Sequence, residues 1–324
     1  MPSNPINADR QFLTSRSACP LAGPQRRAFT LVELLVVIGV IAVLLSITIP
    51  ALSKARSAAR NVATTAQLRE ITSMYVLYAQ NNRGALLPGF LPNTVRGQAP
   101  SVSDPFSLHT FTGRTARMWA WRLAESAGNS RTSVFSILRP TLTTAGLPQR
   151  SDSATAAESK AYAAALYPVF GLNTVFLGGH ARSTLTSVDF FQGFNPDGTP
   201  STADHVARKL TDVGNASRQI VFVETAIQRG SRPIDADDLS GFHYVFPPRA
   251  DRASGVYWTA AQGKVIVQLP ATPARTLGVP YTRSGKSARI PTAFLDGHVD
   301  ALSPMELTDM RLWTSTATRQ DFDF

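Results

Sequence analysis

The sequence predicts an α+β protein in which one long N-terminal helix packs on a C-terminal antiparallel sheet with extra loops and short helices. An uncharged apolar run near the N-terminus passes directly into an amphipathic helical pattern, which indicates one continuous helix. The second half of the chain changes to short runs of branched and aromatic residues separated by turn residues, the pattern of antiparallel strands. Helix and strand patterns segregated along a chain are typical of the α+β class.

The first half of the predicted helix is long enough to cross a membrane. No residue from Leu34 to Ser53 is charged, which makes twenty residues in a row. At about 1.5 Å per residue this is roughly 30 Å of helix, the thickness of the hydrocarbon core of a bilayer. We therefore expect residues 29–53 to form the membrane-spanning half of the helix, with Gly39 and Pro50 as candidate bend points.

The second half of the helix, residues 54–82, is amphipathic. Small and apolar residues recur at spacings of three and four, and polar residues lie between them. Such a narrow apolar stripe predicts packing on a soluble domain. The pattern ends near Asn82, shortly before Gly84, and glycine commonly follows the end of a helix.

The remaining chain, residues 83–324, is predicted to form a globular head. Residues 84–115 are expected to be an irregular connection, because proline and glycine interrupt every pattern there. Helices are predicted over Ala116–Ser126, Ala156–Leu166 and Asp204–Val213, and strands at Val221–Val223, Val265–Val267 and Thr292–Leu295. Asp296-Gly297, directly after the last of these strands, is a tight-turn signal, since glycine accepts the positive φ that such turns need.

The net charge and the number of cysteines indicate which partners and which structural bonds the chain can have. The formal net charge is +10, but apart from the pair Arg26-Arg27 the arginines are scattered and no nucleic-acid-binding motif is present. We therefore expect no nucleic-acid partner. Cys19 is the only cysteine, so the chain can form neither an internal disulfide nor a cysteine-based zinc site.

Residues 1–28 have the composition of a processed leader. They are polar, basic and rich in Pro and Ser, and they lack the apolar stretch of an ordinary secretory signal. The order Arg26-Arg27, then Phe-Thr-Leu-Val-Glu from Phe29, then an apolar run closely resembles the processing site of type IV prepilins and type II secretion pseudopilins. The resemblance implies a pilin-like fold, cleavage between Ala28 and Phe29 by a prepilin peptidase, and N-methylation of Phe29. Most of these proteins have glycine before the cut, and the small Ala28 is expected to allow processing.

Glu33 is the candidate assembly residue. An ionised carboxylate near the edge of a membrane segment is costly and usually has a partner. The resemblance implies that Glu33, the fifth residue of the mature chain, pairs with the terminal amine of a neighbouring subunit as a filament grows. The alternative is that Glu33 lies at the interface and simply reaches water.

Basic residues flank the apolar run on both sides, with Arg26-Arg27 before it and Lys54, Arg56 and Arg60 after it. The positive-inside rule therefore decides the orientation only weakly. The resemblance implies a single-pass protein of the inner membrane with its N-terminus in the cytoplasm and its head in the periplasm.

The C-terminal stretch Phe294–Leu302 carries a second resemblance. It is similar to the ending of pilin-like proteins of planctomycete bacteria, which combine a prepilin N-terminus with a histidine, nine residues and then Asp-Gly. In this chain the residue ten positions before Asp296 is Lys286, so the histidine of that pattern is missing.

A metal site near this C-terminal stretch is a weaker hypothesis. Asp296, His298 and Asp300 alternate, so in a strand they would share one face and could hold a metal. Resemblance to pseudopilins makes calcium the candidate ion, and a second candidate site is the acidic loop with Asp235, Asp237 and Asp238. The favoured alternative for the first set is a hairpin turn whose polar side chains face water.

No enzymatic function is predicted. The chain contains no phosphate-binding loop, no Gly-x-Ser-x-Gly motif and no His-Glu-x-x-His motif. The resemblance to prepilins and pseudopilins implies a pseudopilin-type structural subunit whose Leu34–Leu52 helices pack in a filament, with a prepilin peptidase, other subunits and a secretion machinery as partners. Alternatives are a membrane-tethered binding domain that does not polymerise and a membrane-anchored hydrolase.

Overall fold

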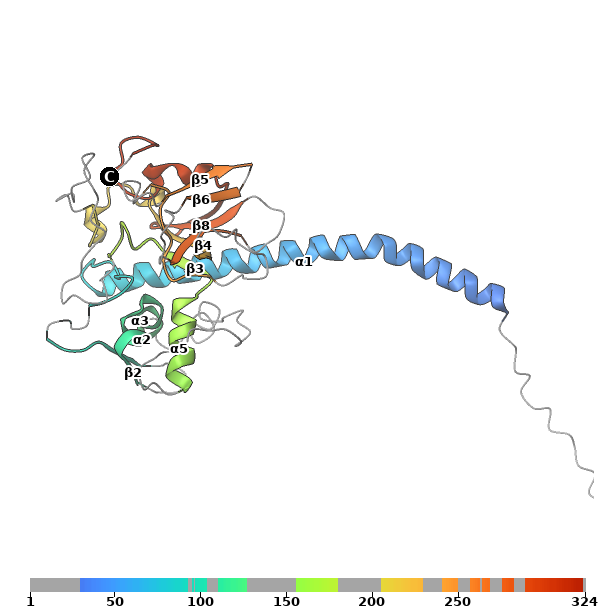
Figure 1. The fold of residues 1–324 in the computed structure, drawn as a ribbon, viewed down its shortest axis with the longest axis horizontal. Helices are drawn as coiled ribbons and strands as arrows, with labels where there is room; N and C mark the ends of the chain where they lie inside the picture. The colour runs from blue at the N-terminus through green and yellow to red at the C-terminus, as the bar shows by residue number, and fades with distance from the viewer. Residues whose placement is uncertain are drawn as a thin grey trace, which may run out of the picture. The chain divides into compact units, whose positions relative to one another are not determined.

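The structure is a computed structural model (Figure 1). It describes residues 30–92, 95, 97–103, 110–126, 156–179, 205–229, 241–249, 257–262, 264–268, 276–282 and 289–322. The predicted leader, Ala28 and Phe29 lie outside these residues. The chain divides into two units, one that ends at Lys54 and one that begins at Ala55.

The long N-terminal helix is confirmed as α1, which spans Leu31–Asn81. Its end lies within one residue of the predicted one, and Pro50 lies inside the helix without ending it. In the first unit, every side chain from Leu31 to Lys54 is exposed. Among the described residues, α1 is the one helix that is long and apolar enough to cross a membrane.

The predicted apolar stripe is buried only in the last part of α1, from Leu68 onward, whereas its earlier positions Ala58, Ala59 and Val62 are exposed. The buried positions follow the helical repeat along one face: Leu68, Ile71, Thr72, Met74, Tyr75 and Ala79. Their apolar side chains share a core with the sheet, where the ring of Tyr75 meets that of Phe222 edge-on at 5.6 Å between centroids. In Figure 1 this part of α1 runs between the sheet and the short helices α2, α3 and α5, whose side chains join the same core.

Within the described residues the main sheet has five strands, and their pairings are antiparallel, as predicted. Its strands are β3 (Phe170–Leu172), β4 (Ile220–Arg229), β7 (Thr276–Pro280), β8 (Ile290–Phe294) and β9 (Val299–Leu302). They follow the order β3-β4-β8-β9, and β7 pairs with the C-terminal half of β4. The residues of β8 are all buried, which explains its continuous run of apolar and small residues.

A second core lies between this sheet and the C-terminal segment. The hairpin of β5 (Tyr257–Ala261) and β6 (Lys264–Gln268) contributes Trp258, whose ring meets that of Trp313 edge-on at 6.3 Å. Asn173 and Gln219 donate side-chain hydrogen bonds to the carbonyl oxygen of Trp313. These buried bonds attach the end of the chain to the sheet.

Three predictions for the head differ from the structure. The helix predicted over Ala116–Ser126 is two helices, α2 (Gly113–Arg117) and α3 (Trp119–Ser126). Met118 between them is extended, because it pairs as a bridge with Phe90. By contrast, the helix predicted over Ala156–Leu166 is confirmed as α5.

The helix predicted over Asp204–Val213 is wrong for its described part. Only the single 3-10 turn η1 (Leu210–Asp212) forms there. Ala207 and Lys209 instead form bridges with Leu177 and Ala85, so the backbone takes its hydrogen-bond partners from other segments.

The stretch 84–115 is likewise more regular than predicted. It contains β1 (Ser101–Ser103) and β2 (Thr110–Thr112), which pair antiparallel. The remaining short 3-10 turns are η2 (Ala216–Arg218), η3 (Glu306–Thr308) and η4 (Met310–Leu312).

Candidate functional site

The N-terminus of α1 is closed by a reciprocal pair of side chains. Oε2 of Glu33 accepts hydrogen bonds from the backbone nitrogen and the hydroxyl of Thr30, each at 2.9 Å. The hydroxyl oxygen of Thr30 in turn accepts a hydrogen bond from the backbone nitrogen of Glu33 at 3.2 Å. This is a capping box, in which side chains at the first turn satisfy backbone groups that the helix leaves open.

The capping box gives Glu33 a contact within its own chain. A carboxylate in the first turn is also favoured by the positive end of the helix dipole. The spacing Thr30-x-x-Glu33 is itself a sequence signature of a capping box, so this contact was readable from the sequence but was not predicted. The predicted contact of Glu33 with a neighbouring subunit involves a second chain and stays a prediction.

The apolar part of α1 satisfies its own polar side chains. The hydroxyl of Ser46 donates to the carbonyl oxygen of Val43, and that of Thr48 donates to the carbonyl oxygen of Leu44, each at 2.7 Å. In hydrocarbon every polar group must find a partner within the protein, and these bonds meet that condition. The exposed apolar surface of this segment is therefore compatible with lipid or with other apolar helices.

The tight turn predicted at Asp296-Gly297 is present between β8 and β9, and Gly297 has a φ of 94°. Oδ1 of Asp296 lies 2.6 Å from Nδ1 of His298 and accepts a hydrogen bond from the backbone nitrogen of His298 at 3.1 Å. The imidazole is stacked flat on the ring of Phe294, with 4.2 Å between centroids. The turn thus holds the Asp296–His298 pair at its tip.

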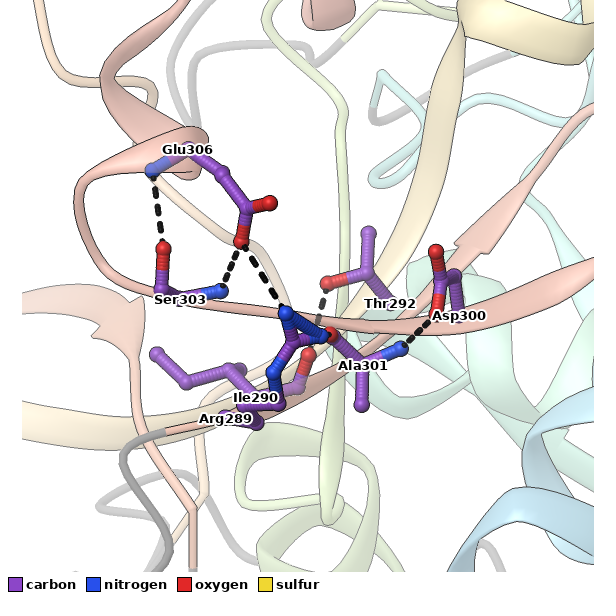
Figure 2. Close-up of polar contacts among 7 residues, drawn as sticks. All are labelled: Arg289, Ile290, Thr292, Asp300, Ala301, Ser303 and Glu306. Carbon is purple, nitrogen blue, oxygen red and sulfur yellow. Dashed lines mark hydrogen bonds and ion pairs between the residues drawn. The ribbon is translucent and has the colours of Figure 1, made fainter.

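The carboxylate of Asp300 does not join the Asp296–His298 pair. Its Oδ1 accepts a hydrogen bond from the backbone nitrogen of Ala301 at 2.7 Å (Figure 2). Because β9 begins only at Val299, Asp300 is the one residue of the predicted set that lies in a strand. Within the described residues no group of three His, Cys, Asp or Glu side chains is placed to hold a metal. Asp235, Asp237 and Asp238 lie outside the described residues, and calcium binding stays a prediction.

A shallow groove follows β9, with a volume of about 340 Å³, and its lining consists of Leu302, Met305, Glu306, Asp309, Leu312 and Gln320. The carboxylate of Glu306 accepts a hydrogen bond from the backbone nitrogen of Ser303 at 2.7 Å and lies 3.9 Å from a guanidinium nitrogen of Arg289 (Figure 2). The carboxylate of Asp309 is bound by the guanidinium of Arg311. The carboxylates of Glu306 and Asp309 are therefore both engaged in contacts with nearby residues of the protein.

Comparison with known proteins bears on the N-terminal segment. Residues 24–49 match the prokaryotic N-terminal methylation motif, a range that includes the basic pair, Phe29, Glu33 and most of the apolar run. No curated protein and no solved structure matches the chain. The resemblance of the C-terminal stretch to planctomycete proteins thus stays a prediction. The N-terminal segment of this chain, by its motif and by the apolar helix that follows, is a prepilin-type methylation segment with a single candidate membrane span.

Proposed function

We propose that this protein is a pilin-like structural subunit, a pseudopilin of a type II secretion or type IV pilus-like filament. One observation carries the proposal: the methylation motif at residues 24–49 leads into a helix whose side chains are exposed throughout its uncharged part. The subunit is inserted in the inner membrane with its N-terminus in the cytoplasm, cut before Phe29 by a prepilin peptidase, and then assembled through α1.

The exposed apolar side chains support the assembly step. In the first unit of the chain, large apolar residues from Leu31 to Leu52 expose between 48% and 79% of their surface. An apolar surface of this extent requires lipid or another apolar surface around it. In the proposed cycle the lipid of the membrane is exchanged for the Leu34–Leu52 segments of neighbouring subunits.

The capping box leaves Glu33 able to make the proposed contact between subunits. The hydrogen bonds from Thr30 both reach Oε2, and within the described residues Oε1 has no partner. A carboxylate offers about four acceptor positions on its two oxygens. Oε1 can therefore accept the terminal amine of a neighbouring subunit while Oε2 closes its own helix.

Mass spectrometry of the N-terminus of the mature protein tests the proposal most directly. The expected product begins at a methylated Phe29 when a prepilin peptidase is present, and the uncut chain is expected when it is absent. A variant with Ala28→Trp should remain uncut, because the residue before the cut must be small. A mature chain that keeps residues 1–28, or an Ala28→Trp variant that is cut normally, would contradict the proposal.

Replacing the anchor separates a subunit from a tethered domain. A filament subunit needs Glu33 and its own apolar helix, whereas a tethered domain works with any anchor. We expect a chain whose residues 29–53 are replaced by an unrelated membrane helix to reach the membrane and to be missing from sheared filaments. Normal incorporation of that chain would favour the tethered binding domain.

A further inference from the structure

Arg56 and Arg60 form a pair of like charges on α1. They are four residues apart, so they lie on the same face of the helix about 6 Å apart along its axis. Like charges at this spacing destabilise a helix unless an anion lies between them. Along the chain no acidic residue occurs between Glu33 and Glu70, so the helix does not supply that anion.

The fold does not supply an anion either. Both side chains are exposed, and within the described part of the chain neither guanidinium has a hydrogen bond or an ion pair. Two other surface arginines show the contrast: Arg311 binds Asp309, and Arg289 lies beside Glu306. The pair on α1 therefore presents two uncompensated positive charges to its surroundings.

The position of the pair in the sequence points to the source of the anion. Arg56 is three residues beyond Ser53, the last residue of the uncharged run, and Arg60 is seven residues beyond it. Along the helix Arg56 lies about 5 Å and Arg60 about 10 Å beyond Ser53, and the polar headgroup layer on one side of a bilayer is about 5–8 Å thick, so Arg56 falls within that layer and Arg60 just beyond it. Helical side chains also lean towards the N-terminus, so both guanidinium groups extend back towards the uncharged run.

We propose that Arg56 and Arg60 bind the phosphate groups of anionic phospholipids at the membrane surface that borders Ser53. A planar guanidinium binds a phosphate through two parallel hydrogen bonds, and two of them one turn apart can hold one headgroup or two neighbouring ones. This inference rests on the membrane insertion of the proposed function. The bound lipid would oppose extraction of the subunit from the membrane. The contacts of Arg56 and Arg60 with lipid must therefore break before α1 enters a filament.

The test uses the full chain in nanodiscs that contain equal amounts of phosphatidylglycerol and phosphatidylcholine. After transfer to a mild detergent, native mass spectrometry counts the lipids of each kind that stay bound. We expect the wild-type protein to retain more phosphatidylglycerol than phosphatidylcholine. The variant Arg56→Gln/Arg60→Gln should lose this preference by about tenfold, since each cation near an anionic surface contributes roughly fivefold before screening by salt.

A matched control separates the pair from net charge. The variant Arg69→Gln/Arg114→Gln removes two exposed arginines elsewhere and should retain lipid as the wild type does. Equal retention of the two lipids by the wild type, an unchanged preference in the Arg56/Arg60 variant, or an equal loss in the control would each overturn the inference. A changed association between copies without a changed lipid preference would also overturn it, because the anion would then belong to another subunit.

The outcomes also distinguish the inference from the proposed function. Recovery of the protein with the nanodiscs shows insertion, independently of which lipid it retains. If the protein prefers phosphatidylglycerol but never forms filaments, the proposed filament function is wrong and the proposed lipid-binding site is still supported. Normal filaments from a protein without lipid preference would overturn the lipid site alone.

Discussion

Glu33 binds Thr30 through a single oxygen atom. Oε2 of Glu33 lies 2.9 Å from the backbone nitrogen of Thr30 and 2.9 Å from its hydroxyl oxygen. The carboxylate thereby orders the start of α1 directly after the expected cleavage site. In the proposed subunit the same residue serves the helix with Oε2 and the neighbouring subunit with Oε1. The two roles can be separated by substitution.

Thr30→Val keeps the carboxylate and removes the hydroxyl, whereas Glu33→Ala removes the carboxylate. Losing one side of a helix cap costs about 1 kcal/mol, so Thr30→Val should reduce incorporation into filaments modestly. Glu33→Ala removes the capping contact with Thr30 and the proposed contact with a neighbouring subunit, and should nearly abolish incorporation. The measurement is the amount of subunit in the sheared filament fraction relative to the cell-bound amount. Wild-type incorporation of the Glu33→Ala chain would disprove the assembly role.

Gly278→Ala should destabilise the head severely. A Cβ atom at Gly278 would lie 1.9 Å from the backbone oxygen of Tyr244, and the backbone of Tyr244, which forms a bridge with Leu172, cannot move aside cheaply. We expect the free energy of unfolding to fall by about 3 kcal/mol. All four tryptophans lie in the head, so their fluorescence during denaturation reports on it.

Gly214→Ala is the control for this substitution. Nothing lies within 4 Å of a Cβ atom at Gly214, and the residue is exposed. Its effect should stay within about 0.5 kcal/mol. Equal effects of the two substitutions would mean that the strands around Gly278 are not packed as described.

Tyr75 should tolerate loss of its hydroxyl but not of its ring. The side chain is fully buried, burial raises its pKa, and the hydroxyl has no hydrogen-bond partner among the described residues. Tyr75→Phe keeps the edge-on contact with Phe222 and should be neutral or stabilising by up to about 1 kcal/mol. Tyr75→Ala should cost about 4 kcal/mol. Chemical denaturation measures both, and a loss above about 1 kcal/mol in Tyr75→Phe would reveal a hydroxyl partner.

The contact between Asp309 and Arg311 should make the free energy of unfolding of the head depend on pH. Hydrogen bonds from the side chain of Arg311 hold the pKa of Asp309 below 3.8, against an opposing effect of partial burial. Because the pKa is lowered in the folded state, the stabilisation is complete well above pH 3.8 and is lost as the pH falls through the folded pKa. We expect Asp309→Asn to lower the free energy of unfolding at neutral pH, and its difference from the wild type to shrink progressively as the pH falls below about 4.

The exposed pair Arg319–Asp321 provides the comparison for Asp309. Both side chains are more than half exposed, and such surface pairs contribute little to stability. Asp321→Asn should therefore leave the unfolding curve unchanged between acidic and neutral pH. If Asp309→Asn behaved in the same way, the contact with Arg311 would contribute nothing to stability.

The elements that were predicted correctly depend on neighbours along the chain. α1 follows from the uncharged run and the stripe around Tyr75, and the turn at Asp296-Gly297 follows from a dipeptide. Two of the three errors lie where distant segments supply the backbone partners. Met118 leaves the helical conformation to pair with Phe90, and Ala207 is extended because it pairs with Leu177. No local pattern contains that information.

The candidate site divides in the same way. The charge pattern and motif around Glu33 were sufficient to identify the prepilin-type segment, because processing and membrane insertion depend on a short linear stretch. The proposed metal set was judged from alternation alone, and folding gave its members different partners: Asp296 binds His298, and Asp300 binds the backbone of Ala301. Hydrophobicity and charge along the chain thus determine the helix and its motif, whereas the strand pairings and the core of the head are set by contacts between segments remote in sequence.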